Sequence, residues 1–187
     1  VLCVGAGIVI GRAMQVERQA RILVTYGTAI CGASAIATMS AVIGASGTPG
    51  KLGWNVFTNL VSHKFQGKLY PINPQADEIH GCKAYPSISA VPEPVDVAII
   101  LVSAGVTPDV VEECCKCGVR YIVVESAGFA ELGEEGKKIE LAMKAIADKY
   151  GVRLLGPNCS GIINTHCSMV QSIGIVDALS MGNIGLV

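Results

Sequence analysis

Residues 41–53 read AVIGASGTPGKLG, an apolar run that breaks into glycines at every third position. A strand, a glycine-rich turn and a helix in this order form an anion site, because the helix start leaves N–H groups unpaired and glycine lets a phosphate approach the backbone. We therefore expect a strand at 41–46, a phosphate-binding turn, and a helix at 52–65. A turn that only tightens the packing of the strand against the helix is the alternative.

Two common phosphate-binding patterns do not match this turn. The dinucleotide pattern G-x-G-x-x-G fails because Ser46 and Pro49 stand at two of its glycine positions. A P-loop ending at Lys51 also fails, since the chain has Ala45 in place of its first glycine and Leu52 in place of the hydroxyl residue after the lysine. The sequence thus predicts a turn with its own spacing, in which the side chains of Ser46 and Thr48 donate hydrogen bonds and Lys51 supplies a positive charge.

Short apolar runs alternate with amphipathic segments after residue 40, as in α/β proteins. The predicted helix at 108–117 has Thr107 as its N-cap and Gly118 as its stop, and Gly67 caps the first helix. The sequence predicts a Rossmann-like, doubly wound parallel sheet with helices on both faces. The other predicted segments are strands at 68–74, 95–104 and 120–128, a fifth strand with its turn at 153–161, and a helix at 134–150.

The composition points to a small molecule as the partner. Fourteen Lys and Arg residues against fifteen Asp and Glu give a net charge of -1, so neither a basic surface for nucleic acid nor an acidic tail is expected. Eight cysteines are too few for a disulfide scaffold and favour the reducing cytosol. We expect a cytoplasmic protein, with membrane contact only through residues 1–40. Residues 22–40 carry no charge, and both a membrane span and a buried helical hairpin remain open.

Asn73 and Pro74 end the predicted second strand, where NAD-binding folds place a carboxylate that accepts the ribose hydroxyls. Without a carboxylate, the site does not repel a ribose that carries a phosphate, and coenzyme A is a ligand with such a ribose. An ordinary turn at these residues is the alternative.

Five motifs then occur in a fixed order: AVIGASGTPGKLG, LYPINPQADEIHGCKAYPSI, VDVAIILVSA, ESAGFAELGEEG and LLGPNCSGIINT. From Ala41 to Thr165 the sequence resembles the CoA-binding domain of NDP-forming acyl-CoA synthetases. This family is typified by ADP-forming acetyl-CoA synthetase and, more distantly, by the α subunit of succinyl-CoA synthetase.

The resemblance implies a reversible reaction in which acyl-CoA, NDP and phosphate give acid, CoA and NTP, by way of an acyl phosphate and a phosphohistidine. The phosphohistidine and nucleotide-grasp domains are not in this chain, so we expect it to bind CoA, to be inactive alone, and to work with further ligase domains or a grasp subunit. The alternatives are a stand-alone CoA-binding regulatory module and, less favoured, an NAD-dependent oxidoreductase.

The resemblance also assigns parts of CoA to parts of the chain. The diphosphate lies on the glycine turn, the adenosine at the end of the second strand, the pantetheine along the turns after the third and fourth strands, and the thiol near GPNCSG. Gln75 stands where many relatives have lysine, which leaves the adenosine phosphate contact open. The residues carried over are Ser46, Gly47, Thr48, Gly50, Lys51, Asn73, Pro74, Val102, Ser103, Ala104, Ser126, Ala127, Gly128, Asn158 and Cys159.

Residues 1–40, with TAICGASAIA as the most specific part, resemble an internal stretch of a polytopic membrane family of sulfate exporters. We expect an apolar helical segment at 1–40, a CoA-binding domain at 41–165, and at 166–187 a linker and the first strand of a further domain.

No catalytic or metal-ligating residue is predicted. None of the histidines, His63, His80 and His166, stands in the phosphohistidine context of the family. Cys159 is expected to be a wall of the CoA site rather than a nucleophile. The cysteines at 114, 115 and 117 are spaced along one helix so that they cannot all face one metal ion.

Overall fold

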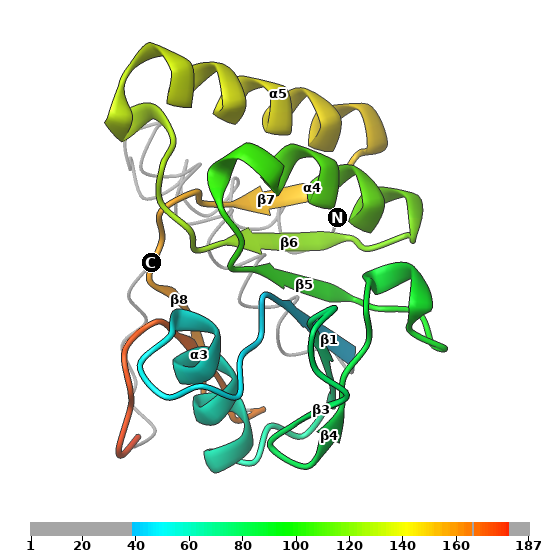
Figure 1. Cartoon of the computed structure of the whole chain (residues 1–187), viewed down its shortest axis with the longest axis vertical. Helices are drawn as coiled ribbons and strands as arrows, with labels where there is room; N and C mark the ends of the chain where they lie inside the picture. Colours follow the sequence, from blue (N-terminus) through cyan, green and yellow to red (C-terminus); the bar gives the residue numbers. More distant parts are fainter. Residues whose placement is uncertain (1–38, 166, 180–187) are drawn as a thin grey trace, which may run out of the picture.

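Five parallel strands form one sheet in the computed structural model, which describes residues 39–165 and 167–179 (Figure 1). Their order across the sheet is β2-β1-β5-β6-β7, so the predicted α/β class and parallel sheet are confirmed. Residues 1–38 of the segment predicted at 1–40 lie outside the described residues, as does the strand predicted at 183–187; residues 39 and 40 belong to β1. The strands are β1 Met39–Ile43, β2 Lys68–Ile72, β5 Val97–Ile100, β6 Tyr121–Val124 and β7 Arg153–Leu155, and the helices are α3 Leu52–Ser62, α4 Thr107–Lys116 and α5 Glu134–Tyr150.

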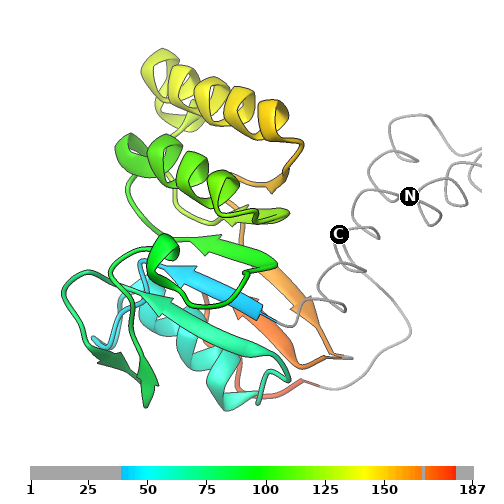
Figure 2. The same cartoon turned by 90° about the vertical axis from the view of Figure 1, so that its right-hand side faces the viewer.

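Different helices cover the two faces of the sheet: α4 and α5 lie on one side and α3 on the other (Figures 1 and 2). Successive side chains of a strand point to opposite faces, which divides the core in two. In β5, Ala98 and Ile100 pack with α4 and α5, whereas Val97 and Ile99 pack with α3. The prediction of helices on both faces is therefore confirmed.

Two short hairpins complete the described chain, and the sequence did not predict either of them. One joins β3 (Glu78–Ile79) to β4 (Cys82–Lys83), and the other joins β8 (Gly161–Asn164) to β9 (Met169–Ser172). The β8–β9 hairpin lies on the same face as α3 and extends across the predicted domain boundary at residue 165. Single turns of 3-10 helix occur at η1 (Ile88–Ala90), η2 (Ala104–Val106) and η3 (Ala130–Leu132).

The segment 172–176, here called the strap, runs along α3 and is tied to three polar side chains spaced one helical turn apart. Asn55 Nδ2 donates to a strap carbonyl at 2.8 Å. Asn59 Nδ2 donates to two strap carbonyls at 3.0 and 2.7 Å, and Asn59 Oδ1 accepts a strap N–H at 3.1 Å. His63 Nε2 lies 2.7 Å from a further strap carbonyl oxygen. Side chains of the α3 segment thus satisfy several backbone groups of the strap, while the Ile173 N–H donates to the Ser160 carbonyl at 3.3 Å.

Two predicted helix ends are wrong. The first helix was predicted to continue to 65 with Gly67 as its cap, but α3 ends at Ser62 and the left-handed residue beyond it is Lys64, with φ +56°. Thr107 is the first residue of α4 rather than its N-cap, and its hydroxyl donates to the Ser103 carbonyl at 3.0 Å.

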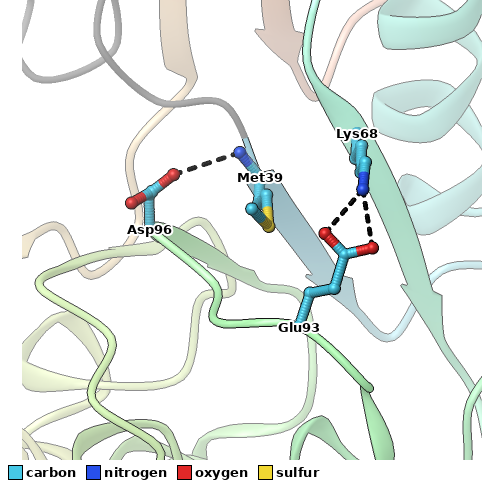
Figure 3. Close-up of polar contacts among 4 residues, drawn as sticks. All are labelled: Met39, Lys68, Glu93 and Asp96. Carbon is cyan, nitrogen blue, oxygen red and sulfur yellow. Dashed lines mark hydrogen bonds and ion pairs between the residues drawn. The ribbon is translucent and has the colours of Figure 1, made fainter.

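Polar contacts fasten the amino ends of the strands (Figure 3). The Met39 N–H donates to the Asp96 carboxylate at 3.1 Å, and Lys68 Nζ contacts both carboxylate oxygens of Glu93 at 2.6 and 2.5 Å. The hydrogen bond between Lys68 and Glu93 raises the pKa of the lysine and lowers that of the glutamate.

In the part of the chain that the structure describes, no helix is long and apolar enough to cross a membrane.

Candidate functional site

Five turns meet at the carboxyl edge of the sheet, because parallel strands all end on the same side. In a doubly wound sheet, ligands bind outside this edge where the strand order reverses, here between β1 and β5. Each turn contains residues that the sequence proposes for the site, so the fold brings all five groups to one edge. The turns are residues 44–51 after β1, 73–75 after β2, 101–104 after β5, 125–128 after β6 and 156–159 after β7.

The glycines of the first turn fall into two groups. Gly44 has φ +89°, and a Cβ there would lie 2.9 Å from the Leu101 carbonyl oxygen. A Cβ on Gly53 would lie 1.9 Å from the Gly44 carbonyl oxygen, so these two glycines allow α3 and the sheet to approach closely. Gly47 and Gly50 are exposed, and a Cβ at either would meet no atom within 4 Å. Close packing therefore accounts for Gly44 and Gly53, but not for Gly47.

The amino end of α3 opens from this turn. Its N-cap residue is the exposed Lys51, with no side-chain cap and no acidic residue in the first turn. The Ser46 side chain is 8% exposed, and its Oγ accepts the Thr48 N–H at 3.1 Å. The Ser46 hydroxyl thus shapes the turn as an acceptor and still has its own hydrogen, so its donation to a phosphate stays a prediction. Unpaired N–H groups, the positive end of the helix dipole and a lysine together favour an anion here.

Asn73 fastens the end of β2 to the glycine turn. Its Nδ2 donates to the Ala45 carbonyl at 2.9 Å, and its Oδ1 accepts the Gln75 N–H at 2.8 Å. The side chain that the sequence assigns to adenosine therefore already has partners at both ends. Pro74 and Gln75 are exposed beside it. This arrangement makes Asn73 a positioning residue for the turn.

The turns after β5 and β6 touch each other. A Cβ on Gly128, which has φ +112°, would lie 3.1 Å from the Ala104 Cβ. Ser103 and Ala127 are exposed, while Val102 and Ala104 are half-buried. The Ser126 hydroxyl is buried and has no hydrogen-bond partner among the described residues. It is thus a buried polar group that the described part of the fold leaves without a partner.

The turn after β7 contacts the end of β6. The Asn158 N–H donates to the Ser126 carbonyl at 3.0 Å, and the Cys159 Sγ donates to the Val124 carbonyl at 3.4 Å. Burial raises the pKa of the Cys159 thiol, which disfavours the thiolate that a nucleophile needs. Across residues 39–165 and 167–179, no three metal-ligating side chains lie close enough together to hold a metal ion.

The sequence reasoning missed one residue at this edge. Glu125 directly follows β6, is 3% exposed, and accepts a hydrogen bond from Gln171 Nε2 at 2.8 Å. Burial raises its pKa to about 7. The signal in the sequence was a charged residue directly after the apolar run YIVV, inside the quoted motif ESAG.

Comparison with known protein families identifies the family of this domain. Residues 38–165 match the family described as CoA binding domain. The chain belongs to this family. The match confirms the predicted CoA-binding domain and coenzyme A as its ligand. Residues 1–53 also match the family described as Conserved hypothetical protein 698, which agrees with the separate resemblance noted for residues 1–40.

Similar proteins are ADP-forming ligases. The chain is 46% identical over 147 residues to ADP-forming acetate–CoA ligase II of Archaeoglobus fulgidus, covering 79% of this chain and 22% of that protein. It is 43% identical over 143 residues to ADP-forming acetate–CoA ligase I subunit alpha of Pyrococcus furiosus, covering 74% of this chain and 31% of the subunit.

A solved structure agrees. Dinucleotide-forming acetyl-coenzyme A synthetase 1 of Ca. Korarchaeum cryptofilum, in complex with phosphate and ADP, matches with a TM-score of 0.73 and 42% identity over 76% of this chain and 30% of that one. The chain therefore spans between about a fifth and a third of the length of these relatives.

Proposed function

We propose that the turns at the carboxyl edge bind coenzyme A, with its diphosphate on the glycine turn and on the amino end of α3. The observation that carries this proposal is the space at Gly47: packing explains Gly44 and Gly53, whereas a Cβ at Gly47 would meet no protein atom within 4 Å. A phosphate that approaches the backbone needs this space free of a Cβ. Lys51, at the helix start, supplies charge to the same anion.

The remaining parts of CoA follow from the order of the turns. The adenosine lies beside Pro74 and Gln75, where Asn73 holds the turn in place. The pantetheine runs across the touching turns after β5 and β6, where the buried Ser126 hydroxyl is available to a ligand group. The thiol ends near Asn158 and Cys159. In this arrangement Cys159 is a wall, because its thiol is held by the Val124 carbonyl.

We further propose that the domain serves an NDP-forming acyl-CoA synthetase, in which acyl-CoA, NDP and phosphate are interconverted with acid, CoA and NTP. Identity above 40% to ADP-forming ligases supports this role. The residues of this chain bind CoA and direct its thiol, while the phosphohistidine and nucleotide steps belong to other domains or to a partner subunit.

Calorimetric titration with CoA, dephospho-CoA and NAD tests the ligand assignment. CoA is expected to bind most tightly, and a concentration of 100 times the dissociation constant should stabilise the fold by about 2.7 kcal/mol. Gly47→Val should weaken CoA binding at least tenfold in a folded protein. Gly174→Val is the matched control, because Gly174 is also exposed, has no positive φ and would place its Cβ 3.9 Å from the nearest atom. Tighter binding of NAD than of CoA, or full affinity in Gly47→Val, would refute the site.

The charge at the helix start has its own test. Lys51→Gln should weaken CoA binding several-fold, and the loss should shrink in high salt, because the interaction is between exposed charges. Lys64→Gln removes the same charge just beyond the other end of α3 and should leave the affinity unchanged.

Turnover tests the wider role separately. The chain combined with a histidine-bearing domain and a nucleotide-grasp subunit of a relative is expected to form ATP from acetyl-CoA, ADP and phosphate. CoA binding without turnover in every such combination would refute the synthetase role and favour a stand-alone binding module.

A further inference from the structure

Glu125 and Gln171 form a buried polar pair between the sheet and the β8–β9 hairpin. Glu125 is 3% exposed and follows β6, while Gln171 is fully buried in β9. One hydrogen bond joins them, from Gln171 Nε2 to Glu125 Oε1 at 2.8 Å. The pair lies on the face that carries α3, because Glu125 is two residues beyond Val123, which packs there.

Two oxygens of this pair have no hydrogen-bond partner among the described residues. Glu125 Oε2 and Gln171 Oε1 are both buried, and neither makes a hydrogen bond to any described residue. A buried acceptor without a donor destabilises the folded state, and more so if it is charged. A carboxylate can only accept, whereas a carboxylic acid has one O–H to donate. A single proton on Glu125 would therefore give both oxygens a partner.

The backbone leaves room for the pair. Gly161 begins β8 with φ +105°, and a Cβ there would lie 2.5 Å from Glu125 Oε1 and 2.1 Å from the Gln171 carbonyl oxygen. The hairpin can therefore approach the carboxyl group only because residue 161 has no side chain.

We propose that Glu125 is protonated in the folded domain and donates to Gln171 Oε1, so that acid and amide form a cyclic pair that fastens the β8–β9 hairpin to the sheet. Loss of the proton leaves a buried charge facing a carbonyl oxygen and loosens the hairpin. The turn that carries Asn158 and Cys159 leads directly into β8. The hairpin that the acid–amide pair holds therefore follows the thiol end of the proposed CoA site in the chain. The proposal does not depend on CoA binding.

The surroundings of Glu125 favour the neutral form. Burial raises its pKa to about 7, and the bond from Gln171 opposes this only in part. In the described ranges, no lysine, arginine or histidine forms an ion pair with it. The titratable group that faces it is Cys159, from the turn after β7, whose own pKa is raised. On the same face of the sheet, the side chains that α3 directs to the strap include Asn55 and Asn59, and both are uncharged.

The sign of the pH effect follows from linkage. The folded pKa of Glu125, about 7, lies above its ordinary value of 4.5. The protonated pair therefore contributes its full stabilisation at pH values below the ordinary pKa of 4.5. This contribution is lost as the pH rises from there through 7. Over pH 5 to 8, the unfolding equilibrium constant should rise on the order of 10²-fold through this one group.

The test compares wild-type protein with Glu125→Gln in urea unfolding at pH values from 5 to 8. An amide at this position can donate to Gln171 Oε1 without a titrating proton, so the variant should lose the 10²-fold rise. Glu131→Gln is the control, because this exposed carboxylate is hydrogen-bonded to the Gly128 N–H and its pKa is lowered, so its proton binds outside this range. A wild-type pH dependence that persists in Glu125→Gln would overturn the proposal.

Carboxyl NMR of protein labelled with ¹³C in glutamate decides the same question even if the variant does not fold. One side-chain carboxyl resonance of the wild-type protein should titrate near pH 7, and amide exchange in β8 and β9 should accelerate over the same range. Titration of every glutamate below pH 5.5 would overturn the proposal.

Discussion

Replacement of Gly53 by alanine tests whether the glycine turn is held together by close packing. Alanine favours a helix over glycine by about 1 kcal/mol, so an α3 residue with free space would be stabilised. The Cβ would instead lie 1.9 Å from the Gly44 carbonyl oxygen and 2.9 Å from its carbonyl carbon. Both are backbone atoms, so they can move away only together with the turn around them.

The helix must therefore shift. Overpacking of this kind costs about 1–3 kcal/mol, occasionally more, and it outweighs the gain in helix propensity. We expect Gly53→Ala to lower the free energy of unfolding by about 2 kcal/mol, and to weaken CoA binding because the amide groups of α3 move.

Urea unfolding followed by circular dichroism measures the effect, with Gly47→Ala as the matched control in the same turn. A Cβ on Gly47 meets no atom within 4 Å and its φ is not positive, so this variant should be as stable as the wild type, or more stable by about 0.4–1 kcal/mol. A Gly53→Ala protein of undiminished stability, or an equal loss in both variants, would refute the division of the glycines into packing and ligand roles.

Three further experiments test the rest of the fold. Phe57→Ala should cost about 3–5 kcal/mol in urea unfolding, because its fully buried ring fills the core under α3, while Leu141→Ala on the exposed face of α5 should change stability by no more than about 0.5 kcal/mol. Asn59→Ala should destabilise the domain by about 1–3 kcal/mol and speed amide hydrogen exchange in the strap, since it removes three hydrogen bonds; unchanged exchange would contradict this. Iodoacetamide should label the exposed Cys117 well before Cys114, because burial excludes the reagent from Cys114 and raises the pKa of its thiol; equal rates in the folded protein would contradict the placement of α4.

The parallel sheet could be predicted from the sequence because its signals are local. The helix predicted at 134–150 matches α5 at both ends, where two glutamates begin it and Gly151 ends it with φ +69°. Gly118, with φ +82°, likewise ends α4 as predicted. These signals need only neighbours in the chain.

The sequence did not predict features that join distant residues. The β8–β9 hairpin is held to the sheet by Glu125 and Gln171, which are 46 residues apart, and the strap is held by Asn59 from more than 110 residues away. The end of α3 was misplaced because Lys64 adopts the left-handed conformation that was assigned to Gly67.

The sequence could predict only the part of the candidate site that depends on local signals. Its turns follow from the ends of parallel strands, whereas the internal partners of Asn73 depend on two turns meeting in space. The buried carboxyl of Glu125 could not be distinguished from an ordinary surface glutamate without the hairpin that covers it.

A crystal structure of the protein with bound CoA tests the central claim most directly. The account predicts diphosphate oxygens within about 2.7–3.2 Å of backbone N–H groups between Ser46 and Gly53, over the open face of Gly47. A diphosphate bound away from this turn, with the amino end of α3 left to solvent, would contradict it.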